Sequence, residues 1–244
     1  RSVGKTTALI NLAAALAKRG KQVMVLDEHQ GAQSVAGMLG LTPCYDLGHV
    51  VKRECSLEQV MLSGPDGIMV VPAGKGVQSL ASLEAEEQAS LAHAFGQLSQ
   101  PVDVVLVDAV AGVASHVLPL SLAAQELVLV VDPQPASMTD AYALIKVLNQ
   151  GFARRSFHII VNRVSGPEEG EAVFRNVAAV ASRFLKVKLD YMGCVSRDEK
   201  LHRATQLGRS VVDAFPATAA AQTFRDLAEE VDQWPHSDGE EGQL

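Results

Sequence analysis

The first residues of the chain carry a pattern suited to binding phosphate. Val3-Gly4-Lys5-Thr6-Thr7 is followed at once by an Ala- and Leu-rich segment with helical spacing. Amides at a helix start and the helix dipole attract phosphate oxygens, Gly permits close approach, Lys neutralises the β and γ phosphates, and a Thr hydroxyl ligates Mg²⁺. The segment therefore matches the second half of a Walker A loop. The alternative is a chance Gly-Lys-Thr before a helix.

Two carboxylates close apolar runs further along the chain. Asp27 ends the first of these runs and Asp108 ends a later one. Because open α/β sheets bind ligands at the carboxyl ends of their strands, both side chains are expected beside the phosphate loop, where each can hold Mg²⁺ through a bound water. The alternative for a single Asp at a strand end is a helix cap. The small residues from Ala109 to Gly112 suit a switch that senses the γ-phosphate.

Apolar runs rich in Val and Ile alternate with segments of helical period over most of the chain. Several runs are apolar on both faces, as expected of parallel strands covered by helices on each side. The runs predict strands over residues 22–27, 67–72, 102–108, 126–132, 157–162 and 188–195. The segments between them predict helices over residues 7–19, 84–98, 137–148, 168–184 and 217–234. The expected fold is therefore α/β, a doubly wound, mostly parallel sheet with helices on both faces.

The predicted organisation is a single nucleotide-binding domain over residues 1–235 followed by a tail. Residues 236–244 are acidic, contain Gly and lack apolar anchors, which predicts disorder. The sequence begins inside the phosphate loop, so the first strand, which normally feeds this loop from the centre of the sheet, is expected to be missing. Truncation and an upstream start are the two explanations, because a sheet without its middle strand leaves two ladders unpaired.

Composition excludes several other classes of protein. The 244 residues carry a net charge of -7, and the Lys and Arg residues are scattered, so direct nucleic-acid binding is not expected. Cys44, Cys55 and Cys194 lack metal-ligand spacing and have apolar neighbours, which predicts buried thiols in the cytoplasm. The histidines show no zinc-binding spacing, and no apolar run reaches the roughly 18 residues of a membrane span.

Four longer segments, together with the residues above, resemble the MinD/ParA ATPases and specifically their FleN/FlhG branch. The segments are YDLGHV at 45–50, GPDGIMVVP at 64–72, TDAYALIK at 139–146 and LDYMG at 189–193. The resemblance implies a P-loop NTPase of the deviant Walker A type that binds ATP or ADP with Mg²⁺ and forms a face-to-face homodimer on ATP. It also implies control of flagellar number or placement, with the GTPase FlhF, flagellar master transcription activators and the flagellar switch protein as partners.

The resemblance also assigns roles to residues at matching positions. Lys5 and Thr6 take the phosphate and Mg²⁺ roles, and Asp108 takes that of the switch-II Asp. Asn162 takes that of the residue that reads adenine, and the other side of the base would be lined by Val195, Ser196 and Asp198. Alternatives stay open at two of these positions, since Asn162 could close a strand end and Val195 could belong to the core.

The chain departs from the family pattern at three places. Arg1 and Ser2 stand where the family has two glycines, and the signature Lys before them is not in the sequence. His29 replaces an Asp that orients the attacking water, and Ala109 replaces a Thr of many relatives. Because a neutral imidazole supplies no fixed negative charge, slow ATP hydrolysis is expected. The alternative is that His29 is a solvent-facing switch residue and catalysis is carried elsewhere.

The last predicted helix carries an apolar stripe opposite acidic residues. The stripe comprises Phe224, Leu227, Ala228, Val231 and Trp234. Anionic lipid would repel the acidic side, so docking on the core is expected rather than membrane binding.

Three functions compete on these residues. The first is a nucleotide-gated flagellar regulator with weak ATPase activity. The second is a degenerate, non-hydrolysing relative that acts by protein contact alone. The third, a ParA-like DNA partition motor, is disfavoured by the acidic balance of the chain.

Overall fold

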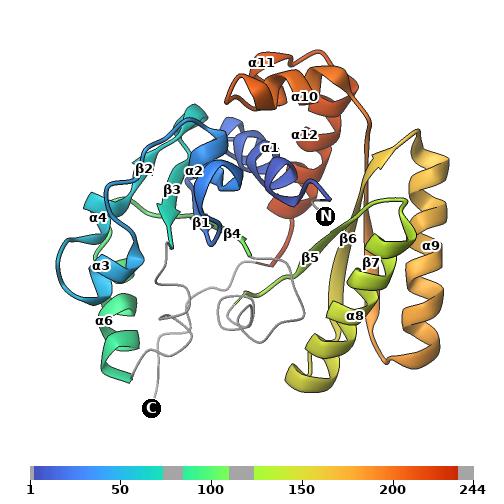
Figure 1. Cartoon of the computed structure of the whole chain (residues 1–244), viewed down its shortest axis with the longest axis horizontal. Helices are drawn as coiled ribbons and strands as arrows, with labels where there is room; N and C mark the ends of the chain where they lie inside the picture. Colours follow the sequence, from blue (N-terminus) through green and yellow to red (C-terminus); the bar gives the residue numbers. More distant parts are fainter. Residues whose placement is uncertain (1–2, 74–84, 110–123, 236–244) are drawn as a thin grey trace.

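The computed structural model describes residues 3–73, 85–109 and 124–235 of the chain (Figure 1). Their strands are β1 (Val23–Asp27), β2 (Leu62–Ser63), β3 (Met69–Pro72), β4 (Val104–Asp108), β5 (Val128–Val131), β6 (Ser156–Val164) and β7 (Lys188–Ser196). Their helices are α1 (Lys5–Lys18), α2 (Val35–Met38), α3 (Leu47–Val51), α4 (Leu57–Val60), α6 (Ala85–Gly96), α8 (Pro135–Phe152), α9 (Pro167–Phe184), α10 (Glu199–Gln206), α11 (Val211–Ala214) and α12 (Ala219–Asp232), with short 3-10 turns η1 (Gly31–Gln33) and η2 (Pro65–Gly67).

Every strand and helix predicted from the sequence is present, with ends that differ by a few residues. The elements that the sequence did not predict are short: β2, α2, α3, α4, α10 and α11. Segments this short show too few repeats of a helical or strand period to be recognised. The acidic tail predicted over residues 236–244 lies outside the described residues.

The mostly parallel sheet is divided into two in the described residues. The strand orders are β2-β3-β1-β4 and β5-β6-β7, and every pair is parallel except β2 with β3. The division falls between β4 and β5, which do not hydrogen-bond to each other. Val105 of β4, beside this division, is 49% exposed although it is apolar.

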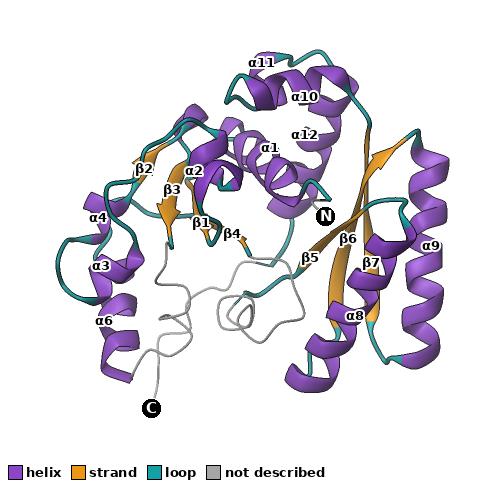
Figure 2. Cartoon of the chain, in the orientation of Figure 1, coloured by secondary structure: helices purple, strands orange, loops and turns teal. Residues whose placement is uncertain are grey.

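One apolar layer joins the two sheets. The core around α1 and α12 contains Val25 and Val70 of the first sheet together with Ile160 and Met192 of the second. Helices α8 and α9 cover the opposite face of β5-β6-β7, and α3, α4 and α6 cover the opposite face of the first sheet (Figure 2). Helices therefore lie on both faces, and α1, which begins at the phosphate loop, is held by residues from both sheets.

Helix α12 docks on this shared layer, as predicted. The apolar stripe is buried at Phe224, Leu227, Ala228 and Val231, and Trp234 packs against it from the rim. Asp232, on the acidic side, pairs with Arg19 and Lys21 beyond the end of α1. Among the described residues, no helix is both long enough and apolar enough to cross a membrane.

The cysteines are less buried than predicted. All three are free, Cys44 is exposed, and Cys55 and Cys194 are half-buried. The prediction of buried thiols is therefore wrong for Cys44, because its apolar neighbours in sequence belong to a surface connection between α2 and α3. Partial burial raises the pKa of the Cys55 thiol, since desolvation disfavours the thiolate.

Candidate functional site

The phosphate loop ends at Gly4, which adopts a left-handed conformation with φ of +85° directly before α1. This φ suits Gly because an L side chain is strained there. The first-turn amides of a helix have no partners within the helix, and Gly4, at the N-cap position of α1, has no side chain that could cap them. The first turn of α1 also contains no acidic residue. The amides and the dipole of α1 are therefore directed at a position where an anion can bind.

Asp108 joins the two polar residues at the start of α1. Its carboxylate accepts a hydrogen bond from Lys5 Nζ on Oδ1, and one from Thr6 Oγ1 on Oδ2 at 2.6 Å. Asp108 is fully buried at the carboxyl end of β4, so its charge depends on these donors for solvation. The structure brings these three side chains together at one edge of the sheet, and their roles toward phosphate and Mg²⁺ stay predictions.

Asp27 lies beside Asp108 because β1 and β4 pair in parallel with these two residues in register. Its two carboxylate oxygens accept backbone N–H groups from His29 and Ala36, each at 3.1 Å. Burial raises the pKa of Asp27, because desolvation opposes ionisation more than these hydrogen bonds favour it. Asp27 thus holds the chain that follows β1, and its predicted water-mediated Mg²⁺ contact stays a prediction.

His29 contacts the phosphate-binding Lys directly. The distance between His29 Nε2 and Lys5 Nζ is 2.9 Å, and Nε2 lies 3.8 Å from Asp108 Oδ2. An ammonium can only donate, so the imidazole accepts through Nε2 in this arrangement. The sequence placed His29 at the site, and the structure adds that its ring shares Lys5 with Asp108. It does not lie apart from the site as a solvent-facing residue.

The residues predicted to line the base lie at the carboxyl ends of β6 and β7. Val195 is fully buried in the core, and Asp198 caps α10 by accepting the N–H groups of Lys200 and Leu201. Ser196 is half-buried at the end of β7. The structure therefore places Val195 in the core, the alternative left open above, and makes Asp198 a helix cap; their contacts with a base stay predictions.

An open recess lies next to these residues at the start of α10. Its volume is about 790 Å³, which is within the range of small-molecule sites, and it is lined by Arg197, Asp198, Glu199, Lys200, His202, Arg203 and Gln206. All seven side chains are polar, and three of them are cationic while two are anionic, so the charges of the lining nearly balance.

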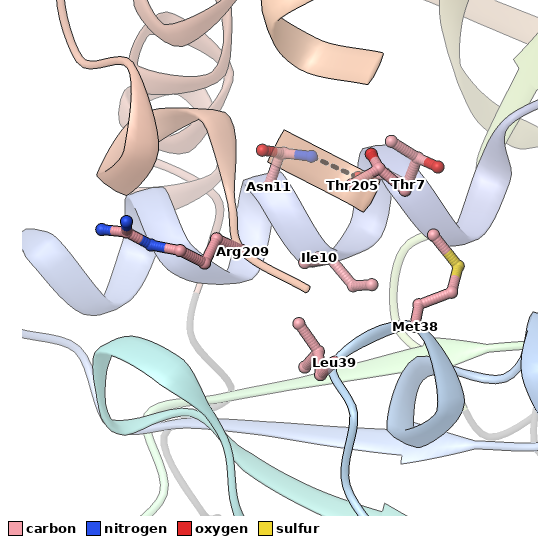
Figure 3. Close-up of a pocket in the computed structure, with 7 residues that line it drawn as sticks. All are labelled: Thr7, Ile10, Asn11, Met38, Leu39, Thr205 and Arg209. Atoms are coloured by element: carbon pink, nitrogen blue, oxygen red, sulfur yellow. Dashed lines mark hydrogen bonds between the residues drawn. The ribbon is translucent and has the colours of Figure 1, made fainter. Parts of the chain in front are cut away.

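Figure 3 shows a different cavity, between α1, α2 and α10, that is too small for a nucleotide. Its volume is about 10 Å³, roughly the space of one water.

Beside this cavity, Asn11 donates to the Thr7 carbonyl and accepts from the Val211 N–H. Asn11 therefore ties the first turns of α1 to α11. The sequence patterns did not single out Asn11, although a single Asn in an Ala- and Leu-rich helix indicates a polar contact.

Arg1 and Ser2 of the phosphate loop and Gly112 of the predicted switch lie outside the described residues. Ala109 is described and half-buried, directly after Asp108. Its role as the start of a switch stays a prediction.

Thr6 and Asp108 are the residues that fit Mg²⁺. Both offer oxygen, the donor this ion prefers, and their oxygens lie 2.6 Å apart at the start of α1. No cluster of three or more His, Cys, Asp or Glu in the described part of the chain could hold a metal without further ligands. Mg²⁺ usually takes one or two protein ligands and completes its shell with phosphate and water.

The fold and this edge of the sheet define a P-loop nucleotide-binding protein. A family model described as the CobQ/CobB/MinD/ParA nucleotide binding domain matches residues 2–211. The antiactivator FleN of Pseudomonas aeruginosa is 42% identical over 96% of this chain and 83% of its own length. The flagellum site-determining protein YlxH of Helicobacter pylori is 29% identical over 93% of this chain and 76% of its own.

A solved structure agrees with these sequence matches. MinD in the MinC:MinD cell division protein complex of Aquifex aeolicus superposes with a TM-score of 0.74 and 26% identity, covering 96% of this chain and 93% of that one. The chain belongs to the MinD/ParA family of P-loop ATPases, as the sequence predicted.

The close approach of Gly4 to the Asn162 side chain predicts a specific sensitivity to substitution. A Cβ added at Gly4 would lie 2.4 Å from Asn162 Nδ2, whereas one added at Gly20, which has a similar φ of +87°, would meet nothing within 4 Å. In urea denaturation we expect Gly20→Ala to cost about 1 kcal/mol of unfolding free energy from backbone strain alone. Gly4→Ala should cost roughly a further 1–3 kcal/mol from overpacking. Equal losses in the two variants would show that Gly4 is not held against Asn162.

Proposed function

We propose that this protein is an ATP-binding regulator of flagellar number or placement. The observation that supports this most strongly is that Lys5, Thr6 and Asp108 meet in one hydrogen-bonded group, in a chain 42% identical to an antiactivator FleN over 96% of its length. A second relative, the flagellum site-determining protein YlxH, is matched over 93% of this chain. The name of YlxH refers to the flagellum, which is also the setting that the resemblance to the FleN/FlhG branch implies.

The chain's own residues bind ATP and Mg²⁺ in defined roles. Lys5 leaves Asp108 and contacts the β and γ phosphates, while the first-turn amides of α1 bind phosphate oxygens. Thr6 would ligate Mg²⁺ through its hydroxyl, and Asp108 and Asp27 would hold the ion through bound water. When bound, Mg²⁺ neutralises the charge that develops on the phosphates. Asp108 would therefore lose its hydrogen bonds with Lys5 and Thr6 on taking up this role.

The base lies on the β6–β7 side of the phosphate loop in this proposal. Asn162 reads the adenine, and its other face is lined by Val195, Ser196 and Asp198. Ala109 and Gly112 belong to the switch that responds to the γ-phosphate.

Hydrolysis is slow in this proposal because His29 occupies the position of a carboxylate. The attacking water must be oriented by a group with fixed negative charge, and phosphoryl transfer depends on such positioning and electrostatics. The imidazole instead accepts a hydrogen bond from Lys5, so its Nε2 is engaged with the phosphate-binding residue. This contact also favours the alternative of a non-hydrolysing relative that acts by protein contact alone.

ATP binding then controls a homodimer, and the dimer selects its partners. In the FleN/FlhG branch these are the GTPase FlhF, a flagellar master transcription activator or the flagellar switch protein. A ParA-like partition motor is the third alternative, and DNA binding that weakens with salt would favour it. The net charge of -7 opposes direct binding to nucleic acid and to anionic membranes.

The regulatory role can be tested by counting flagella. The chain is produced in a flagellated bacterium lacking its own FleN-type protein, and flagella per cell are counted by electron microscopy. We expect the chain to lower the number and Lys5→Ala to abolish the effect, because the loop loses its phosphate-binding charge. Lys52→Ala, at an exposed Lys after α3, is the control and should act like the unchanged chain. No effect of the unchanged chain would contradict the role, and equal effects of Lys5→Ala would contradict its dependence on nucleotide.

The His29 assignment predicts a gain of activity. His29→Asp restores a fixed negative charge beside Lys5, so we expect ATP turnover, measured as phosphate release, to rise by about tenfold or more. His93→Asp, at an exposed position of α6, is the matched control and should leave turnover unchanged. Unchanged turnover in His29→Asp would show that this position does not limit hydrolysis.

A further inference from the structure

Arg163 has a backbone conformation that is unusual inside a strand. It lies in β6 with φ of +59°, a region where a residue other than Gly is strained. The pairing with β7 shifts at the same place, because Asn162 pairs with Val195 and Val164 with Ser196, leaving Arg163 as an extra residue. This is a β-bulge, and bulges beside binding sites redirect side chains.

The bulge brings two consecutive side chains to the same loop. Successive residues of a regular strand point to opposite faces. Here the position of a Cβ on Gly4 lies 2.4 Å from Asn162 Nδ2 and 3.8 Å from Arg163 Nη2, so both side chains reach the phosphate loop. The strained backbone therefore has a local consequence at the candidate site.

Asn162 is hydrogen-bonded at both ends of its amide. Its Oδ1 accepts the N–H of Arg163 at 2.9 Å, which directs Nδ2 toward the loop, where it donates to the Val3 carbonyl at 2.9 Å. Asn162 is 7% exposed, so these two bonds are largely shielded from water. The side chain assigned to adenine is thus already engaged with the backbone of the phosphate loop.

Arg163 extends this connection to β5. Its Nη1 lies 3.8 Å from Oδ2 of Asp132, a buried residue directly after β5. Asp132 is itself fixed, since its N–H donates to Ser137 Oγ and its Oδ1 accepts from the Gln134 N–H. The carboxyl ends of β5 and β6 are therefore linked to Val3 and Gly4 through three side chains: Asp132, Arg163 and Asn162.

We infer that Asp132, Arg163 and Asn162 position the phosphate loop, so that Asn162 and Arg163 set affinity for the phosphates and not only for the base. Asn162 and Arg163 are positioning residues in this sense, because they hold the Val3 carbonyl and the Gly4 backbone in the conformation that directs the amides of α1. The inference rests on the proposed nucleotide site and extends it to residues that the phosphate-loop motif does not contain.

A ligand without a base separates positioning from base reading. Binding of Mg-ATP and of Mg-tripolyphosphate to the full chain is measured by titration calorimetry. For Asn162→Ala we expect tripolyphosphate affinity to fall by about five- to tenfold, the effect of one lost hydrogen bond, with ATP affinity falling at least as much. Asn176→Ala, on the exposed face of α9, is the control and should change neither affinity.

Variants of Arg163 keep the test decisive if Asn162→Ala does not fold. Arg163→Met should lower tripolyphosphate affinity by a similar factor, and Arg163→Lys, which keeps the cation facing Asp132, should restore most of it. Loss of ATP affinity with unchanged tripolyphosphate affinity in Asn162→Ala, or equal behaviour of Arg163→Met and the unchanged chain, would overturn the inference. Failure of the unchanged chain to bind either ligand would instead contradict the proposed nucleotide site.

Discussion

Asp108 accepts hydrogen bonds from Lys5 and Thr6, and the rest of the site is arranged around this group. A fully buried carboxylate is costly unless charged and polar donors surround it. Here the donors are the two residues that the phosphate-loop motif provides for phosphate and Mg²⁺. Without ligand, the carboxylate and the ammonium satisfy each other. In the proposed function, nucleotide uptake exchanges these contacts for phosphate and metal, and His29 takes part because it shares Lys5.

This group forms only because segments distant in sequence meet at the carboxyl ends of parallel strands. The in-register pairing of β1 with β4 sets Asp27 beside Asp108, and the core layer around α1 and α12 holds the start of α1 against both sheets. Since β4 and β5 are not paired, this layer supplies the main described link between the sheets. A further link lies at the site itself, where the Asn162 side chain of the second sheet donates to the Val3 carbonyl of the phosphate loop. The stability of the fold and the geometry of the phosphate loop therefore depend on the same elements.

Sequence patterns predicted the long elements and the meeting of Lys5, Thr6 and Asp108, because strand-end position and the helix-start motif depend on local spacing. They did not predict the division of the sheet or the exposure of Cys44, since both depend on which segments pack together. The bulge at Arg163 was also missed, because a positive φ at Arg has no sequence signal comparable to Gly or Asn. His29 was predicted at the site, but its contact with Lys5 required the three-dimensional arrangement.

The most direct measurement is a calorimetric titration of the chain with ATP, with Mg²⁺ present and then with Mg²⁺ removed by a chelator. If Lys5 and Thr6 exchange Asp108 for phosphate and metal, ATP binds at one site per chain with Mg²⁺. Its affinity then falls by about tenfold or more without the ion, because Asp108 is left beside the phosphates as an uncompensated negative charge. No uptake of ATP, or uptake that is indifferent to Mg²⁺, would contradict a site built on Lys5, Thr6 and Asp108.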